Sequence, residues 1–340
     1  MTLTSSQNRA TLGLRNGPFD SFRLRATAWR HRIANGLFAR NPVSPSALEA
    51  SLARGVIADF RATRYIHFGD LMFFFPLLLA LAARAPVTCL ATGEHYQFLK
   101  FLLGDEPLIQ VTDTLAGGAD APRLVITSPY SIGLDPHAWA GDHLYGVGLA
   151  DEPVAERYPE YLANAFFRLT GLPYEGPQAN RDRILGWCAR VREKAIQHDT
   201  DACLALDAPV LWFAPYMGSG RFRDLFGCHK RAVIAHACAK AQSHGQSLLL
   251  AGGKNDPLIT LERPPLIDMR GRAITEMMRL AASPQVREGV GFDGFWMHFF
   301  DILGKPFEVR FRGRFTRAAR DLHYQSVNVS FNYSTERRYF

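Results

Sequence analysis

The chain is poor in cysteine and has no long apolar segment. Its five cysteines are odd in number and include no C-x-x-C pair, so a disulfide scaffold and a zinc site are both unexpected. The longest apolar run, Leu71 to Ala83, has thirteen residues and contains Pro76, whereas a membrane-spanning helix needs about 20. The first twenty residues lack the apolar core of a secretory signal. These absences favour a protein of the reducing cytosol.

The charge balance of the chain indicates what kind of partner it binds. Lysine and arginine outnumber aspartate and glutamate, 39 to 32, which gives a formal net charge of +7. That surplus favours acidic partners, namely phosphates, an anionic membrane face or nucleic acid, without choosing among them. The 340 residues suit two domains of typical size, and 47% of them are hydrophobic, an ordinary globular value.

Arginine is concentrated at the start of the chain. Residues 1–41 contain seven arginines, no lysine and a single acid, Asp20. Apolar residues recur there at helical spacing, as a stripe of Phe22, Ala26, Trp29, Ile33 and Leu37. The pattern predicts a basic amphipathic helix within an extension over 1–60. Such a helix can lie on an anionic membrane surface, or pack its stripe on the main domain with its arginines solvated; the pattern leaves both open.

Short apolar strands alternate with helices over 61–205. After a capping box at Ser46 and Glu49, which predicts a helix running through Val56, we expect strands at 65–68, 87–91, 108–111 and 123–127. Gly69 and Asp70 form the predicted turn between the first strand and a helix that starts at Leu71. Asp70 can therefore cap that helix or face a ligand at the carboxyl end of the strand.

A loop after the fourth strand carries hydroxyl groups to the same edge of this sheet. Ser128 and Tyr130 lie in that loop, where either a substrate contact or a plain turn accounts for them. Together with Gly69 they are our candidates for contacts with a substrate at this edge.

The alternation starts again over 206–340. Strands are expected at 209–214, 247–251, 267–270 and 307–311, with helices at 232–244, 273–281 and 299–303. A glycine loop with Gly218 and Ser219 follows the first of these strands, and Arg221 and Arg223 come soon after it. Further glycines and a cation follow the next two strands, at Gly252, Gly253 and Arg272. Glycine loops expose backbone N–H groups, and basic neighbours suit a phosphate-bearing ligand.

The two halves together predict an α/β fold with two Rossmann-like domains, over 61–205 and 206–340, that face a cleft. Clefts between domains are common ligand sites. Because the glycine loops and cations gather in the second half, we assign the phosphate-bearing ligand to that domain.

Three stretches in order carry a family resemblance. They are G-D-L-M-F-F-F-P-L-L-L-A-L at 69–81, L-L-L-A-G-G at 248–253 and D-G-F-W-M-H-F-F-D-I-L-G-K-P at 293–306. In sequence and spacing the chain resembles the ADP-heptose lipopolysaccharide heptosyltransferases, which are glycosyltransferases of the two-Rossmann-domain GT-B type. The resemblance covers about Tyr65 to Gly313.

The resemblance implies a role for several residues. Asp70 corresponds to the aspartate proposed there as the general base that takes a proton from the acceptor hydroxyl. The third motif implies that Asp293, Gly294, Met297 and His298 line the sugar and diphosphate of the donor. Arg221 and Arg223 would steady the diphosphate leaving group, with no metal implied. Gly294-Phe295 replaces the family's Ser-Gly, which implies that Phe295 and Trp296 either narrow the approach of the phosphate or reshape the sugar pocket.

We therefore predict an inverting, metal-independent glycosyltransferase with a nucleotide-diphosphate sugar, ADP-linked, as co-substrate and no other cofactor. Heptose or a related sugar would pass to a glycan, glycolipid or glycoprotein acceptor in lipopolysaccharide or other surface-glycan biosynthesis. We expect a cytoplasmic location, peripheral on the inner membrane face, and no nucleic acid partner. The alternative is a non-catalytic basic binding protein on a decayed transferase scaffold. A sugar-nucleotide epimerase is disfavoured because no G-x-G-x-x-G follows the first strand.

Overall fold

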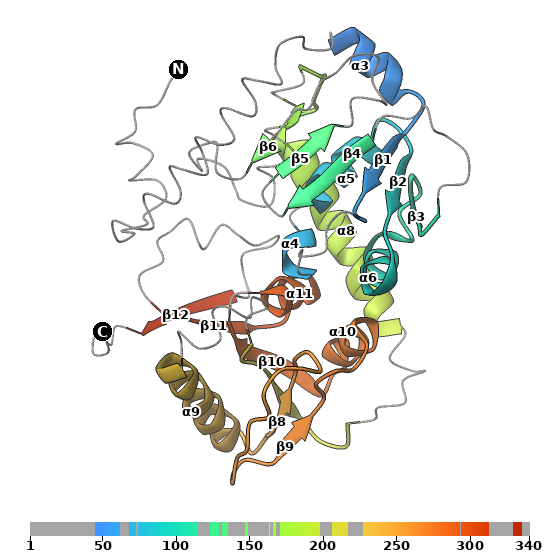
Figure 1. Cartoon of the computed structure of the whole chain (residues 1–340). Coiled ribbons are helices and arrows are strands. Elements are labelled where there is room, and N and C mark those ends of the chain that lie inside the picture. Colours follow the sequence, from blue (N-terminus) through green and yellow to red (C-terminus); the bar gives the residue numbers. More distant parts are fainter. Residues whose placement is uncertain are drawn as a thin grey trace, which may run out of the picture. The chain divides into compact units, whose positions relative to one another are not determined.

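Two six-stranded sheets organise the chain (Figure 1). The structure is a computed structural model, and the chain divides into two units, Met1–Ile184 and Leu185–Phe340. The residues described are 45–61, 68–72, 74–114, 123–128, 131–134, 147–148, 163, 166–167, 171–197, 206–216, 227–292, 294–312 and 329–334. The predicted basic helix over 22–37 lies outside them. Within the described ranges, every helix falls short of the length and apolar character needed to cross a membrane.

The sheet of the first unit has the strand order β3-β2-β1-β4-β5-β6, which the labels of Figure 1 follow. Its first four strands are parallel, whereas β5 and β6 join antiparallel. The strands are β1 Val56–Asp59, β2 Val87–Leu90, β3 Ile109–Thr112, β4 Arg123–Ser128, β5 Ser131–Leu134 and β6 Val147–Gly148. The helices named here are α3 Pro45–Leu52, α4 Phe68–Met72, α5 Phe75–Ala82, α6 Gly93–Leu103 and α8 Pro177–Gln197, the last of which continues into the second unit.

The sheet of the second unit is parallel throughout its described pairings. Its order is β12-β11-β10-β7-β8-β9, so that, counted from β7, it is the 3-2-1-4-5-6 arrangement of the Rossmann fold. The strands are β7 Val210–Ala214, β8 Ser247–Leu250, β9 Leu266–Asp268, β10 Val286–Gly291, β11 Phe307–Arg312 and β12 Val329–Ser334. The helices are α9 Gly227–Ser243, α10 Ile274–Ala282 and α11 Phe295–Leu303.

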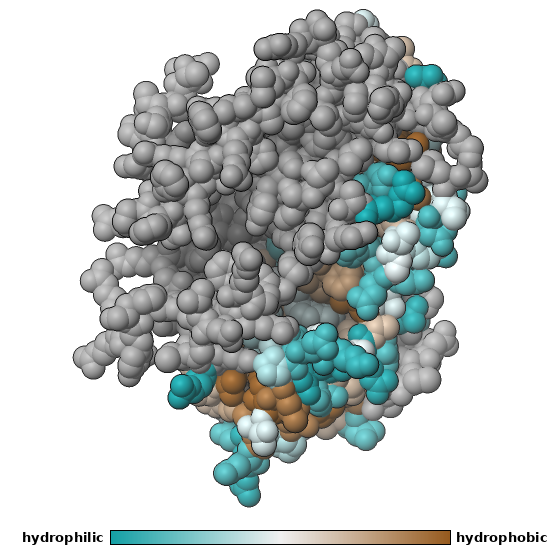
Figure 2. Space-filling model, viewed as in Figure 1, coloured by the Kyte–Doolittle hydropathy of each residue, from teal (hydrophilic) through white to brown (hydrophobic). Residues whose placement is uncertain are grey.

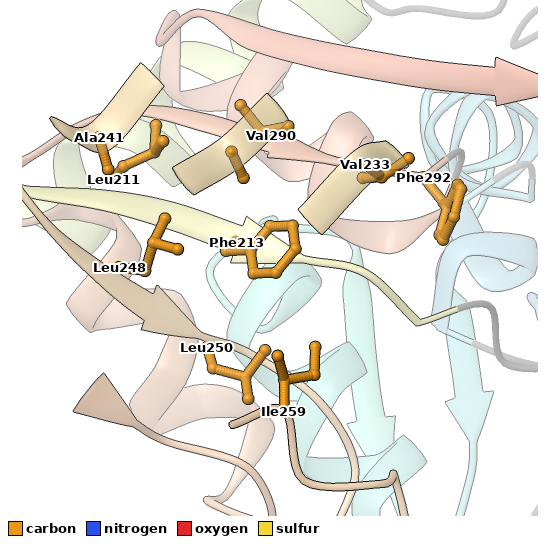
Figure 3. Close-up of a cluster of buried hydrophobic side chains, with 10 residues drawn as sticks. Leu211, Phe213, Val233, Ala241, Leu248, Leu250, Ile259, Val290 and Phe292 are labelled. Atoms are coloured by element: carbon orange, nitrogen blue, oxygen red, sulfur yellow. The ribbon is translucent and has the colours of Figure 1, made fainter. Parts of the chain in front are cut away.

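Both faces of this second sheet are buried. Strand β7 turns Leu211 and Phe213 into a cluster with α9, which Figure 3 shows together with residues from β8 and β10. Trp212, which lies between these two residues in the sequence, contacts Phe300 of α11 instead, with ring centroids 5.8 Å apart. A parallel sheet covered on both faces accounts for the continuous apolar runs of its strands.

The described residues present both polar and apolar side chains on the face drawn in Figure 2. The coloured surface of Figure 2 is mostly hydrophilic, with smaller brown areas among it. The exposed large apolar side chains of the described residues are Leu108, Leu185, Ile196 and Leu258. Scattered exposed apolar residues of this kind are normal and need no functional explanation.

Most predicted strands and helices are confirmed, but the helix predicted to run through Val56 is wrong at its end. Helix α3 stops at Leu52, and Val56 starts strand β1. Gly55 makes this change possible because it has a φ of +99°, a left-handed conformation that favours glycine. The Val56 N–H then donates to the Pro86 carbonyl over 2.8 Å and joins the strand to the sheet.

The predicted turn at Gly69 and Asp70 is also wrong, because both residues lie inside helix α4. Phe68, the predicted end of the strand at 65–68, begins that helix, and residues 65–67 lie outside the described part of the chain. The single long helix expected from Leu71 is two helices, and α5 starts at Phe75. Pro76 stands at the beginning of α5, where its missing N–H costs no helical hydrogen bond. The predicted loop after β4 is shorter than expected, since residues 131–134 form the antiparallel strand β5.

Candidate functional site

The carboxyl edge of the second sheet has the topology of a ligand site. The strand order changes direction between the neighbours β7 and β10, and open α/β sheets bind ligands outside the carboxyl ends at such a point. The segments that follow β7 and β10 stay paired as they leave the sheet, because the Phe292 N–H donates to the Ala214 carbonyl over 3.2 Å. A side chain at Gly291 would run into that same carbonyl oxygen, so glycine permits this close pairing.

The predicted glycines after β8 support a tight loop beside this point. A Cβ atom added to Gly252 would lie 2.6 Å from Cδ2 of Tyr216, which follows β7. The Tyr216 hydroxyl donates to the carbonyl oxygen of Pro257 and ties the two loops together. The Gly253 N–H donates to Oδ2 of Asp256 over 2.6 Å. The loop therefore has a fixed shape in which Gly252 gives the Tyr216 ring its room.

The loop after β9 joins the same group. The Gly271 N–H donates to the Gly252 carbonyl over 2.9 Å. Arg270 holds Asp268 with two hydrogen bonds, from Nε over 2.8 Å and from the terminal nitrogen over 2.7 Å, and also donates to the Asp256 carbonyl. These bonds lower the pKa of the Asp268 carboxyl and raise that of Arg270. Three successive loops are thus connected by hydrogen bonds at one sheet edge.

The predicted phosphate-binding Arg272 stands at the outer side of this group. It is exposed and lies 3.4 Å from Glu276, one turn along α10. Such an exposed pair holds its partners weakly, so Arg272 can turn toward an anion. Lys254, also exposed, belongs to the neighbouring loop and lies beside Gly271.

The start of helix α11 offers backbone donors at the end of β10. Gly294 is its N-cap residue, with no side-chain cap hydrogen bond. Apart from its two chain neighbours, no described residue has an atom within 4 Å of the position a Cβ would take. The first N–H groups of a helix have no partner within the helix and carry the positive end of its dipole. Open space and backbone donors at this point suit an anionic group.

Met297 and His298 lie on the buried side of α11. Met297 is fully buried and His298 is 3% exposed. Burial lowers the pKa of His298 to about 4, which makes the imidazole neutral at pH 7. Their predicted contact with a donor sugar stays a prediction.

Several predicted residues lie outside the described part of the chain. They are Tyr130, Gly218, Ser219, Arg221, Arg223 and Asp293. Asp70 in α4 and Ser128 at the end of β4 are described in their backbone alone. Their roles, and that of Gly69, stay predictions.

The sequence analysis missed an ion pair at the matching point of the first sheet, where β1 and β4 are neighbours. Arg61 donates to both carboxylate oxygens of Asp59, over 3.0 and 2.8 Å. Asp59 is buried, and these hydrogen bonds raise the pKa of Arg61. The spacing of an aspartate and an arginine two residues apart is the signal that could have found it; the same spacing joins Asp268 and Arg270.

No group of three histidine, cysteine, aspartate or glutamate side chains that could hold a metal ion occurs among the described residues. Whether sugar transfer needs a metal ion is not tested by this observation, so the predicted independence from metal stays a prediction.

Comparisons with known proteins give structural neighbours at low similarity. No protein-family model matches the chain, and no curated protein matches it. A glycosyl transferase of family 9 from Veillonella parvula is 13% identical, with 82% of this chain and 85% of that chain covered and a TM-score of 0.47. The ADP-heptose lps heptosyltransferase II of E. coli is 15% identical, with 82% and 89% covered and a TM-score of 0.45.

The E. coli heptosyltransferase WaaC with ADP is a third neighbour. It is 10% identical, with 82% of this chain and 90% of that chain covered and a TM-score of 0.43.

Proposed function

We propose that this protein is an inverting glycosyltransferase that moves a sugar from a nucleotide-diphosphate sugar to a glycan or glycoconjugate acceptor. One observation carries the proposal. The second sheet has the Rossmann strand order, and four of the predicted donor-binding residues follow the carboxyl ends of its strands. Gly294 follows β10, and Gly252 and Gly253 follow β8, next to the β7–β10 switch point, while Arg272 follows the edge strand β9. That is where such sheets bind nucleotides.

The diphosphate of the donor would take the cations and backbone donors at this edge. The N–H groups that begin α11 favour a negative group. Arg272 would add charge, and Arg221 and Arg223 would do the same from the predicted glycine loop. Arginine suits the purpose because its planar guanidinium can bond two phosphate oxygens at once.

In the proposed reaction, an acceptor hydroxyl attacks the anomeric carbon of the donor sugar from the side opposite the diphosphate. The new carbon–oxygen bond forms as the bond to the diphosphate oxygen breaks, so the anomeric configuration inverts. The hydroxyl proton passes to the Asp70 carboxylate, and the nucleoside diphosphate leaves with the bonding electron pair. Arginines and helix N–H groups stabilise its developing charge, which makes a metal ion unnecessary.

The donor and acceptor follow from the sequence resemblance. We propose an ADP-linked heptose or a related sugar as donor, and a lipopolysaccharide precursor or another glycolipid or glycoprotein as acceptor. A cytoplasmic location fits a nucleotide-sugar substrate. The seven arginines of residues 1–41 would bring the protein to the anionic inner face of the membrane.

A thermal-shift panel with ADP, UDP, GDP, CMP and a short RNA tests the proposal. A ligand that binds the folded chain alone raises its melting temperature, and at 100 times its Kd it adds about 2.7 kcal/mol of stability. We expect a shift with one nucleoside diphosphate, ADP first. A folded sample that shifts with RNA, in a salt-sensitive manner, and with no nucleotide would instead support the non-catalytic basic binder.

A further inference from the structure

An aromatic cluster lies between β7 and α11 in the second unit. The ring of Trp212 contacts Trp296, with centroids 4.5 Å apart, and Phe300. Gly289 of β10, which pairs with Trp212 across the sheet, makes room for this cluster. A Cβ added at Gly289 would lie 2.5 Å from a ring carbon of Phe307.

Trp212 carries a polar atom that this packing leaves unsatisfied. The side chain is 0% exposed, and its indole Nε1 has no hydrogen-bond partner among the residues that the structure describes. Buried donors without an acceptor are rare in native proteins, and an individual case calls for an explanation. An indole N–H can only donate, so the missing partner must be an acceptor atom.

Trp296, which contacts Trp212, is in contrast partly exposed. It belongs to the first turn of α11 together with Phe295, which is also partly exposed, and their ring centroids lie 4.8 Å apart. Gly294, just before them, leaves open space and the helix start has no side-chain cap. Aromatic surface and backbone donors therefore meet at the first turn of α11, and the ring of Trp296 lies against the ring of the buried Trp212.

A ligand that suits this point needs an apolar face as well as acceptor oxygens. A pyranose ring attached to a diphosphate has both, since its C–H groups can lie on an aromatic ring while its hydroxyl and phosphate oxygens accept hydrogen bonds. A bare nucleotide or an inorganic anion would use the helix start alone.

We propose that Trp296 is a specificity-determining residue that stacks on the transferred sugar, and that its ring turns on binding so that Trp212 Nε1–H donates to a sugar oxygen. This inference rests on the proposed function, because it assumes that the donor is a nucleotide sugar. It assigns to Trp296 and Trp212 a contact with the sugar and none with the nucleotide. The Trp212 indole N–H, which has no hydrogen-bond partner among the described residues of the free protein, then donates a hydrogen bond to the bound nucleotide sugar.

The test compares Trp296→Ala, Trp296→Phe and Trp212→Phe with the unchanged chain. Isothermal titration would give the Kd of ADP, UDP and GDP and of ADP-heptose, UDP-glucose and GDP-mannose. For Trp296→Ala we expect about tenfold weaker binding of the nucleotide sugar, equal to 1.4 kcal/mol, with the nucleoside diphosphate within about twofold. Trp296→Phe keeps a stacking face and should recover most of that loss.

Two further measurements separate a sugar contact from ordinary packing. Tyr96→Ala removes another partly exposed ring, on α6, and should leave both affinities within about twofold. The indole resonance that Trp212→Phe deletes from a ¹H–¹⁵N spectrum should shift when the nucleotide sugar is added to the unchanged chain, and stay in place when the nucleoside diphosphate is added.

The possible results separate the proposed role of Trp296 from the proposed glycosyltransferase function. An unchanged chain that binds nucleotide sugar, with Trp296→Ala binding it equally well, overturns the stacking role and leaves the glycosyltransferase proposal intact. Equal losses for nucleotide and nucleotide sugar in Trp296→Ala also overturn it, since they indicate a role in folding. An unchanged, folded chain that binds none of the six probes overturns both proposals.

Discussion

The Nζ atom of Lys305 lies 2.7 Å from the carbonyl oxygen of Val286, at the start of strand β10. The same atom lies 2.7 Å from the carbonyls of Ala281 and Ser283, where α10 ends. One half-buried ammonium group thus satisfies three backbone acceptors of the turn that leads from α10 into the strand of the switch point.

Replacing this lysine should weaken the second unit. We expect Lys305→Met to lower the free energy of unfolding by about 2–3 kcal/mol, because three carbonyls lose a charged donor and solvent can replace it only in part. Urea unfolding followed by circular dichroism would measure the change. Lys100→Met, at an exposed position of α6, should change it by less than about 0.5 kcal/mol. Equal stabilities of the two variants would contradict the structural role of Lys305.

Gly252→Ala should strain the loop pair at the candidate site. The added Cβ meets two ring carbons of Tyr216, at 2.6 and 2.8 Å, so we expect a loss of about 1–3 kcal/mol in unfolding free energy and weaker nucleotide binding. Gly253→Ala is the matched control, because its Cβ would make an ordinary contact at 3.5 Å. A double variant with Tyr216→Ala should recover part of the loss, and strict additivity of the two changes would count against the contact.

Burial of His298 should appear in the pH dependence of stability. Its pKa is about 4 in the folded chain and 6.5 as an ordinary value. Between these values the unfolded chain binds a proton that the folded chain does not, so stability falls as pH falls from 6.5 toward 4. The contribution reaches about 3 kcal/mol across the window.

A His298→Gln variant isolates that contribution. Urea unfolding at pH 4.5 and 7.5 should show a loss on acidification that is about 2 kcal/mol smaller in the variant than in the unchanged chain. The comparison uses the difference between the two pH values, so a lower overall stability of the variant does not affect it. Parallel pH profiles would show that burial does not lower the pKa of His298 below its ordinary value.

The sequence predicts the second unit better than the first. The apolar runs at β7 and β8 are buried strands whose neighbours follow the alternation of the chain, and periodicity detects such elements directly. Strand β1 was not predicted, because its sequence V-I-A-D has only four residues and lacks the alternation of apolar and polar residues. Its identity as a strand depends on pairing with Val87, a contact between distant parts of the chain that local pattern does not contain.

The residues of the candidate site also differ in how far the sequence predicts them. Glycines after strands are visible in the sequence, and Gly252 and Gly253 are at the predicted edge of the sheet. Tyr216 and Arg270 were missed because their significance lies in contacts across loops, to Pro257 and Asp256 respectively. Such hydrogen bonds depend on the register of the sheet, which brings the loops together only after folding.

In the proposed mechanism, Asp70 is the residue that takes the proton of the acceptor hydroxyl. Asp70→Asn keeps the size and polarity of the side chain but removes its ability to take a proton, so kcat for sugar transfer should fall by about 10²–10⁴-fold. The affinity for the nucleoside diphosphate should stay within a few-fold, because in the proposed mechanism Asp70 contacts the acceptor.

Steady-state transfer assays with the nucleotide sugar chosen by the thermal-shift panel would measure the Asp70→Asn change, and calorimetry would measure nucleotide affinity. Asp113→Asn, an exposed position after β3, is the matched control and should keep kcat within about twofold of the unchanged chain. Normal turnover by Asp70→Asn would refute Asp70 as the base while leaving the nucleotide site in place. A joint loss of turnover and nucleotide affinity would instead mean that α4 supports the fold, since a base for the acceptor has no reason to affect binding of the leaving group.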